Sequence, residues 1–369
     1  PTVSAERAPP PGTLPDMLRL APDWLDDGDL PLADVAAYAD LAAATRTRGT
    51  PRPIALSDPA LPEWESGLET LALPPALATR GLDPVWEATY GFTLLQVDQV
   101  LTVGQAPDYA TILRGDFDPL AMRDAWVRGG YQAVETEGVT VWSLFPGDTI
   151  DLSAPASRPA LGSLNNVVFL DEQTLVGAPK LSILSAVLRV VHDSAPSLAE
   201  QPEVAALLAP AAVVESYVTA MLLKGRFFLA TPQDAATPIA AIPPVALALV
   251  GLLPPGHDTG SLLEGTPAAV ATPGPNLSPR MVTLLTFADA DAATSAVSLI
   301  QRRLAAGTSE VTGQPHTTRV QPVRVRVIDD EPTVLVEFGL RWGEADWRRI
   351  LDERDLGAMM WAEPDPAGD

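Results

Sequence analysis

The sequence predicts an α+β protein of two similar lobes, each an antiparallel sheet with helices packed on one face, preceded by a helical N-terminal segment. Short runs alternate apolar with polar residues, as half-buried strands do, while other stretches repeat apolar residues at helical spacing. The order strand, helix, hairpin, helix occurs at 109–191 and again, more loosely, at 281–355. We therefore expect a flexible tether at 1–15, a helical segment with the first lobe at 16–192, and the second lobe at 203–369, with the break at 193–202.

Composition narrows the class of protein. The chain has 369 residues, of which 47% are hydrophobic, so two domains with real cores are expected rather than disorder. It carries 24 basic and 47 acidic residues, a net charge of −23, and shows no basic stripe, which argues against nucleic acid and anionic membranes as partners. It has no cysteine, so disulfides and thiol catalysis are excluded. The scarcity of lysine, with abundant alanine and proline, is typical of a GC-rich genome, and the 38 prolines would also suit a heat-adapted protein.

The N-terminal part begins with a Pro-rich run that has no packing pattern. We interpret this run, which starts at Pro1, as a tether that follows a removed export signal, with a trimmed chain as the alternative. Helices are predicted at Asp34–Thr45 and Glu65–Leu73, and a third begins at Asp83-Pro84, where proline suits the first helical position. No apolar run reaches the roughly 20 residues that a membrane span needs.

The elements of the first lobe follow from Thr93 onward. Thr93 and Gln96 form a capping-box pattern that predicts a helix to Gly104, although the alternation of Leu95, Val97, Leu101 and Val103 would also suit a strand. The remaining elements are a strand at 109–114, a helix capped by Asp118 and ended by Gly129-Gly130, a strand at 139–145, a hairpin at 165–177 and a helix from 179 to 191.

The second lobe is predicted to open with an apolar helix at Glu203–Leu223. A strand at 245–250, a strand at 281–287 and a helix with a stripe of Ala293, Val297, Ile300 and Leu304 follow. The clearest hairpin joins 320–328 to 333–340, because valines alternate with arginines up to the Asp329–Pro332 turn. A last helix would bury Trp347, Ile350 and Leu351.

One segment of the chain resembles a known group of proteins. The residues that carry the resemblance are Gly91-Phe92, Val97-Asp98-Gln99, Ile112–Asp118, Gly130-Tyr131, Gly138–Val141 and Leu164–Val167. This pattern, over about residues 90–190, resembles uncharacterised exported lipoproteins of GC-rich bacteria. The resemblance implies a location in the cell envelope and brings no catalytic residues. The lipid-bearing cysteine of such proteins has no counterpart in this sequence.

Two patterns raise the question of a metal site. Asp23–Asp34 places acids at positions one, five, seven and twelve of a calcium-type loop and glycine at position six, but Leu25 occupies position three. An acidic turn that caps the next helix explains the same residues and is the preferred interpretation. The three histidines, His192, His257 and His316, lack the spacing of metal ligands, so we predict no transition metal there.

Catalytic signatures are weak. No nucleophile-elbow serine motif or phosphate-binding glycine loop occurs, and Ser163 does not supply one. The pairs Glu135 with Glu137 and Asp116 with Asp118 would suit carboxylate chemistry, but a helix cap and a shared strand face explain them better. Glu215, a carboxylate in an apolar stretch, is the most unusual single residue and would mark a ligand pocket if buried, but an exposed or arginine-paired position is the preferred interpretation. Trp64, Trp86 and Trp361 lie near loops and are candidates to line a groove, with packing between domains as the preferred interpretation.

From these observations we expect a non-catalytic, extracytoplasmic protein that is tethered through its N-terminus and binds or scaffolds in the cell envelope. Its partner would be an unknown small molecule or envelope protein, and no cofactor is predicted. The alternatives are a small-ligand-binding protein with a cleft between its lobes, where the acidic charge would favour cations, and a carboxylate-based hydrolase.

Overall fold

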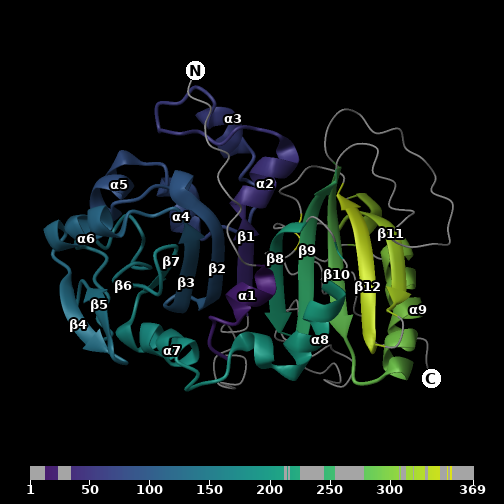
Figure 1. Cartoon of the computed structure of the whole chain (residues 1–369). Coiled ribbons are helices and arrows are strands. Elements are labelled where there is room, and N and C mark those ends of the chain that lie inside the picture. Colours follow the sequence, from purple (N-terminus) through teal and green to yellow (C-terminus); the bar gives the residue numbers. More distant parts are fainter. Residues whose placement is uncertain are drawn as a thin grey trace. The chain divides into compact units, whose positions relative to one another are not determined.

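The computed structural model describes residues 13–23, 35–211, 214, 217–224, 245–253, 278–306, 308, 313–318, 320–328, 331–340, 347 and 350. The chain divides into two compact units (Figure 1). The first contains Pro1–Ala42 and Pro51–Ala205, and the second contains Ala43–Thr50 and Ala206–Asp369. Helices α2 (Leu41–Arg48) and α8 (Pro202–Ala211) contain residues of both ranges.

The first unit is built on an antiparallel sheet with strand order β1-β2-β3-β7-β6-β5-β4. Consecutive residues of the central strand β7 are all buried, so both of its faces are covered. The strands are β1 (Val35–Asp40), β2 (Val97–Gln105), β3 (Asp108–Gly115), β4 (Gln132–Thr136), β5 (Val139–Ser143), β6 (Asn166–Phe169) and β7 (Thr174–Ala178). The helices are α1 (Leu14–Leu18), α3 (Leu61–Ser66), α4 (Pro75–Arg80), α5 (Pro84–Tyr90), α6 (Pro119–Arg128) and α7 (Leu181–Val191), with 3-10 turns η1 (Leu94–Gln96) and η2 (Leu198–Glu200).

The second unit has a sheet of antiparallel strands in the order β11-β12-β10-β9-β8. Helix α9 runs alongside β11 and β12 (Figure 1), and its buried residues Ala293, Ile300 and Leu304 belong to the predicted stripe. The elements are β8 (Tyr217–Lys224), β9 (Val245–Leu253), β10 (Ser278–Thr286), α9 (Ala290–Ala306), the 3-10 turn η7 (His316–Thr318), β11 (Val320–Val327) and β12 (Thr333–Leu340). Trp347 and Ile350 are fully buried, whereas Leu351 lies outside the described residues.

The predicted fold class is confirmed, since the units combine helices with sheets whose strands pair antiparallel within each unit. The hairpin β6–β7 and the hairpin β11–β12 lie where the sequence predicts them. The structure divides the chain between Ala205 and Ala206, within α8, whereas the break was expected at 193–202.

The helix predicted at Glu65–Leu73 lies instead at Leu61–Ser66, and residues 67–73 are not helical. Three further predicted helices are wrong because strand pairing overrides local helix signals. Residues 35–40 of the Ala-rich stretch form β1, which pairs with β2, and only 41–48 are helical. The capping box at Thr93 exists but holds a single 3-10 turn, after which the alternating residues form β2. The apolar stretch from 203 ends its helix at Ala211, one residue after Pro210, and continues as β8.

The Asp118 cap is present as predicted. Its Oδ1 accepts hydrogen bonds from the backbone N–H of Leu120 and of Ala121, both at 3.0 Å, and Pro119 occupies the first helical position. We expect Asp118→Ala to lower the free energy of unfolding by about 1 kcal/mol and Asp118→Asn to change it little, because asparagine caps about as well. Thermal unfolding of the two variants measures the difference, and equal losses in both would contradict the capping role.

Buried tyrosines attach the long connection between β5 and β6 to the rest of the first unit. The Tyr90 hydroxyl donates to the Ala156 carbonyl at 2.8 Å and accepts from the Ala160 N–H at 3.1 Å. The Tyr131 hydroxyl donates to the Leu164 carbonyl at 2.7 Å. Burial raises the pKa of both phenols above the ordinary value, because the anionic form would lose its hydration.

We expect this unit to lose stability in alkali. A raised pKa in the folded state means that the stabilisation is complete below the unfolded pKa near 10 and is lost as the pH rises above it. Each such tyrosine contributes a slope of about 1.4 kcal/mol per pH unit in that range. Urea unfolding between pH 9 and 12 measures how steeply the free energy of unfolding falls with pH. Tyr131→Phe should make this slope shallower by the contribution of one titrating group. An unchanged slope in that variant would contradict this account.

Candidate functional site

A group of buried polar side chains in the first unit is built on the start of β2, where two polar residues precede an apolar run. Asp98 and Gln99 are 3% and 1% exposed. The register of β2 against β3 shifts between Val97 and Gln99. This irregularity places an extra residue in β2, and such bulges redirect side chains. Asp98 and Gln99 therefore each reach a polar partner instead of facing apolar neighbours.

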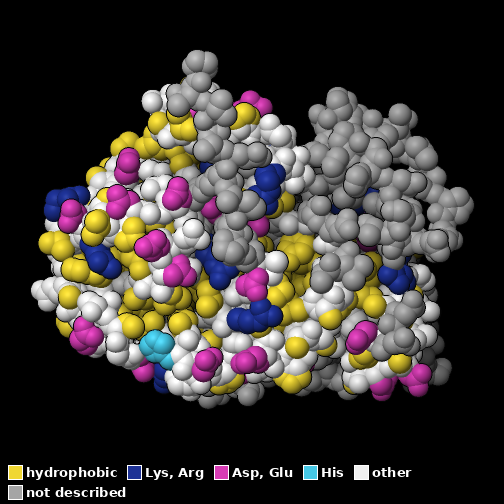
Figure 2. Space-filling view, viewed as in Figure 1, with side chains coloured by type: hydrophobic (Ala, Val, Ile, Leu, Met, Phe, Trp, Pro, Cys, Tyr) yellow, Lys and Arg dark blue, Asp and Glu magenta, His cyan; other side chains and the backbone are white. Residues whose placement is uncertain are grey.

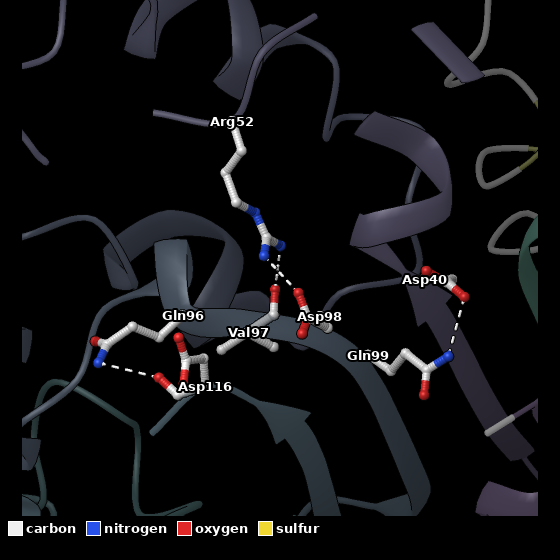
Figure 3. Close-up of polar contacts among 7 residues, drawn as sticks. All are labelled: Asp40, Arg52, Gln96, Val97, Asp98, Gln99 and Asp116. Atoms are coloured by element: carbon white, nitrogen blue, oxygen red, sulfur yellow. Dashed lines mark hydrogen bonds and ion pairs between the residues drawn. The ribbon is translucent and has the colours of Figure 1, made fainter. Parts of the chain in front are cut away.

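Arg52 supplies the partner of Asp98 (Figure 3). Its guanidinium donates to Asp98 Oδ1 and, at 2.5 Å, to the carbonyl of Val97. The side chains of Arg52 and Asp98 are 16% and 4% exposed, so this is a largely buried ion pair. The same guanidinium lies 5.7 Å from the centroid of the Trp64 ring, a cation–π distance.

Gln99 joins β2 to β1 through a second set of hydrogen bonds. Gln99 Nε2 donates to Asp40 Oδ2 at 3.0 Å (Figure 3) and to the Tyr38 hydroxyl at 3.1 Å. The Tyr38 hydroxyl in turn donates to Asp40 Oδ2 at 3.1 Å. Because Asp40 and Gln99 are directly paired across the two strands, the sheet register itself brings them together. We call Tyr38, Asp40, Arg52, Asp98 and Gln99 the β2 polar cluster.

The cluster anchors a loop that presents an apolar side chain. Two residues after Arg52, Ile54 is 85% exposed, the most exposed of the large apolar side chains among the described residues. Asp58 closes this loop by accepting from the backbone N–H of Ile54 at 3.1 Å and of Ala60 at 3.0 Å. These hydrogen bonds from Ala60 and Ile54 hold the pKa of Asp58 below its ordinary value. The loop between Arg52 and Asp58, which we call the Ile54 loop, is thus held at both ends.

The carboxylates of the cluster are engaged in hydrogen bonds within the protein. The carboxylate of Asp98 accepts hydrogen bonds from a guanidinium, and that of Asp40 accepts from an amide and a phenol. Their lone pairs are therefore engaged in the structure that they hold. Among the described residues, no group of three or more His, Cys, Asp or Glu is arranged to hold a metal ion.

Of the three sequence-predicted site residues, the structure describes the two tryptophans. Trp64 and Trp86 are each 2% exposed and lie in the core of the first unit, where Trp86 packs edge-on against Tyr90 and Phe92. The Nε1 of Trp86 is buried and has no hydrogen-bond partner among the described residues. Glu215 lies outside the described residues. The ligand pocket at Glu215 and the groove lined by tryptophans stay predictions.

The other candidates occupy separate places. His192 is exposed at the end of α7. Only the backbone of His316 is described, and His257 lies outside the described residues. Of the Asp23–Asp34 loop, only the first residue is described. Asp23 accepts a hydrogen bond from Gln201. Glu135 accepts from Thr140 at 2.7 Å and Glu137 from Ser185 at 2.6 Å.

Sequence reasoning missed the β2 polar cluster. The available signal was two consecutive polar residues, Asp98 and Gln99, inside an apolar run that continues with Val100 and Leu101. A buried polar pair in such a run requires partners. Nothing local identifies Arg52 as one of them, since 46 positions separate it from Asp98.

The surroundings of the first unit are mixed in character. On the face shown in Figure 2, hydrophobic side chains lie among acidic and basic ones over this unit. Large apolar side chains of the first unit that are more than half exposed include Val85, Leu120, Val127 and Leu161. In the part of the chain that the structure describes, no helix has both the length and the apolar character needed to cross a bilayer.

Comparison with known proteins finds only low similarity to solved structures. No family model and no curated protein matches the chain. Among solved structures, crystal form I of TP0453 aligns at 11% identity with a TM-score of 0.41, covering 97% of this chain and all of that one. Crystal forms III and IV align at TM-scores of 0.38 and 0.40, each over 86% of this chain. Similarity this low carries no information about function.

Proposed function

We propose that this chain is a non-catalytic binding or scaffolding protein of the cell envelope. The observation that carries the proposal is the Ile54 loop, which holds a large apolar side chain in solvent. An exposed apolar side chain on a loop that is already ordered lowers the conformational cost of contacting a partner. The buried Arg52–Asp98 pair and the Asp58 hydrogen bonds supply this order.

The acidic residues that suggested hydrolase chemistry have structural roles here. Asp118 caps a helix, while Glu135 and Glu137 accept hydrogen bonds from hydroxyl groups. These roles favour binding over catalysis. The extracytoplasmic location and the N-terminal tether belong to the same proposal and are supported by the resemblance of residues 90–190 to exported lipoproteins.

Site-specific crosslinking in producing cells tests the binding role. A photoreactive residue in place of Ile54 should crosslink to a component of the envelope fraction. The same residue in place of Glu172, which is exposed in the β6–β7 turn of the same unit, is the matched control. Crosslinks from position 54 that are absent at position 172 support the proposal. Equal labelling at both positions, or recovery of the protein in the cytosolic fraction, would overturn it.

Hydrolase activity is tested separately. Purified protein should not turn over ester, amide or glycoside substrates. Turnover that Asp116→Asn or Glu135→Gln abolishes without loss of thermal stability would replace the binding role with the enzymatic one.

A further inference from the structure

Strand β4 is the last strand of the sheet in the first unit and has one free edge (Figure 1). It pairs with β5 on one side, and no described strand pairs with its other side. Gln132, Ala133 and Glu135 are exposed, while Val134 and Thr136 are half-buried. The edge is therefore open to solvent, and its backbone groups are accessible to another strand.

The register of the β4–β5 hairpin decides which backbone groups face the free edge. The turn at 137–138 has two residues, both with positive φ, so the flanking pair of Thr136 and Val139 exchanges both of its hydrogen bonds. In an antiparallel ladder, such pairs alternate with pairs that exchange none. The N–H and C=O groups of Ala133 and Glu135 therefore point away from β5, toward the free edge.

Both ends of β4 are fixed to the rest of the first unit. Tyr131, immediately before the strand, donates from its hydroxyl to the Leu164 carbonyl at 2.7 Å. Glu137, in the turn after the strand, accepts a hydrogen bond from the Ser185 hydroxyl of α7 at 2.6 Å. A strand that is already held in its extended conformation loses little conformational entropy when a further strand pairs with it.

The edge of β4 also lacks the devices that usually prevent further pairing. Natural edge strands commonly carry a proline, a lysine or a bulge. The sequence of β4 is Gln-Ala-Val-Glu-Thr, and its register with β5 has no shift. Its single charged side chain, Glu135, accepts a hydrogen bond at 2.7 Å from Thr140, which lies opposite on β5. This carboxylate is therefore held on the side of β5, away from the free edge.

We infer that the free edge of β4 pairs with β4 of a second copy of this chain, antiparallel, about a two-fold axis at Val134. In this register, Ala133 of each copy lies opposite Glu135 of the other, and these are the residues whose backbone groups face the edge. They form hydrogen-bonded pairs on both sides of the axis. At the axis itself, Val134 meets Val134 of the second copy in an apolar contact.

The second copy fits this edge because β4 is its own complement. Pairing centred on Glu135 would place two carboxylates opposite each other, which destabilises a sheet and adds to the repulsion between chains of net charge −23. Pairing centred on Val134 places each Glu135 opposite an alanine and uses every backbone group that faces the edge. This inference is independent of the envelope role and of the partner of the Ile54 loop.

Sedimentation equilibrium of the full chain tests the association. Two short strand edges make a small interface, so we expect a monomer–dimer equilibrium with a dissociation constant on the order of 0.1 mM. Removing salt should weaken the dimer, because the two chains carry charge of the same sign. A chain that stays monomeric up to about 1 mM, ten times that constant, would overturn the inference.

Opposite charges at position 133 test the register. Ala133→Lys places a lysine opposite Glu135 of the second copy on both sides of the axis and should tighten the dimer about tenfold. Ala133→Glu places like charges opposite each other and should weaken it about tenfold. Ala121→Lys and Ala121→Glu make the same changes in net charge at an exposed position on α6 and should alter the affinity by less than about twofold. Equal effects at positions 133 and 121 would overturn the proposed pairing.

A single introduced cysteine locates the axis, since the chain has no cysteine of its own. In a pair without hydrogen bonds the two Cα atoms lie about 4.5 Å apart, a separation that a disulfide spans. Under mild oxidation, Val134→Cys should therefore form a disulfide-linked dimer readily. Gln132→Cys, on the same face of β4, is the matched control, because position 132 lies opposite Thr136 of the second copy and not opposite itself. Dimer formation at the same rate in both variants, or none from Val134→Cys, would contradict the inference.

Discussion

Asp98→Ala is expected to lower the free energy of unfolding of the first unit by about 3–5 kcal/mol, the usual cost of removing one partner from a buried ion pair. The reason is the fate of Arg52. Its guanidinium is largely buried and would keep its charge without the carboxylate that balances it. The Val97 carbonyl would remain as an acceptor, but it carries no full charge.

A second arginine–aspartate pair in the same unit provides the control. Arg19 and Asp16 are 2.5 Å apart, but their side chains are 63% and 39% exposed. Arg19→Ala should therefore cost at most about 1 kcal/mol. Urea unfolding of both variants gives the comparison. If Asp98→Ala costs no more than Arg19→Ala, the β2 polar cluster does not anchor the Ile54 loop.

The double variant Arg52→Met with Asp98→Leu removes both charges of the pair, so it separates the loss of the pair from the cost of an unbalanced charge. Replacing both partners by apolar groups of similar size removes the uncompensated charge, so its cost should be well below that of Asp98→Ala. It should also loosen the Ile54 loop, which amide hydrogen exchange at Ile54 would detect. Fast exchange in a stable double variant would show that the pair holds the loop rather than the fold.

Gly91→Ala is expected to cost about 3 kcal/mol, from a left-handed backbone and from overpacking together. Gly91 ends α5 with a φ of 78°. A Cβ at this position would lie 2.6 Å from the Cα of Met122, a backbone atom of α6 that cannot rotate away. Helices α5 and α6 would have to separate, and the buried Met122 and Trp126 would lose contacts.

Gly138→Ala isolates the backbone part of this effect. Gly138 has a φ of 77°, nearly that of Gly91, but no atom lies within 4 Å of the place that an alanine methyl group would occupy. Its cost should be about 1–2 kcal/mol, that of the left-handed conformation alone. The difference between the two variants in thermal unfolding then measures the close approach of α5 and α6. Equal losses would mean that this approach adds nothing.

Local signals determined the elements that carry their own start or stop. The Asp-Pro pairs at 83–84 and 118–119 begin α5 and α6, since the aspartate caps and the proline fits the first turn. The hairpin β11–β12 follows from alternation on both sides of a polar turn, and the hairpin β6–β7 follows from two apolar runs around a polar turn. In each case, the hydrogen bonds that define the element join residues close in sequence.

Only the tertiary structure decided the elements whose partners are distant. Ala-rich 35–40 becomes a strand because Ala36 pairs with Val103, and 217–224 becomes one because it pairs with β9. The β2 polar cluster depends on the same kind of contact, since Arg52 reaches Asp98 only after the sheet has formed. A strand or a buried ion pair completes its hydrogen bonds with residues that the local sequence does not name, whereas a capped helix completes most of its own.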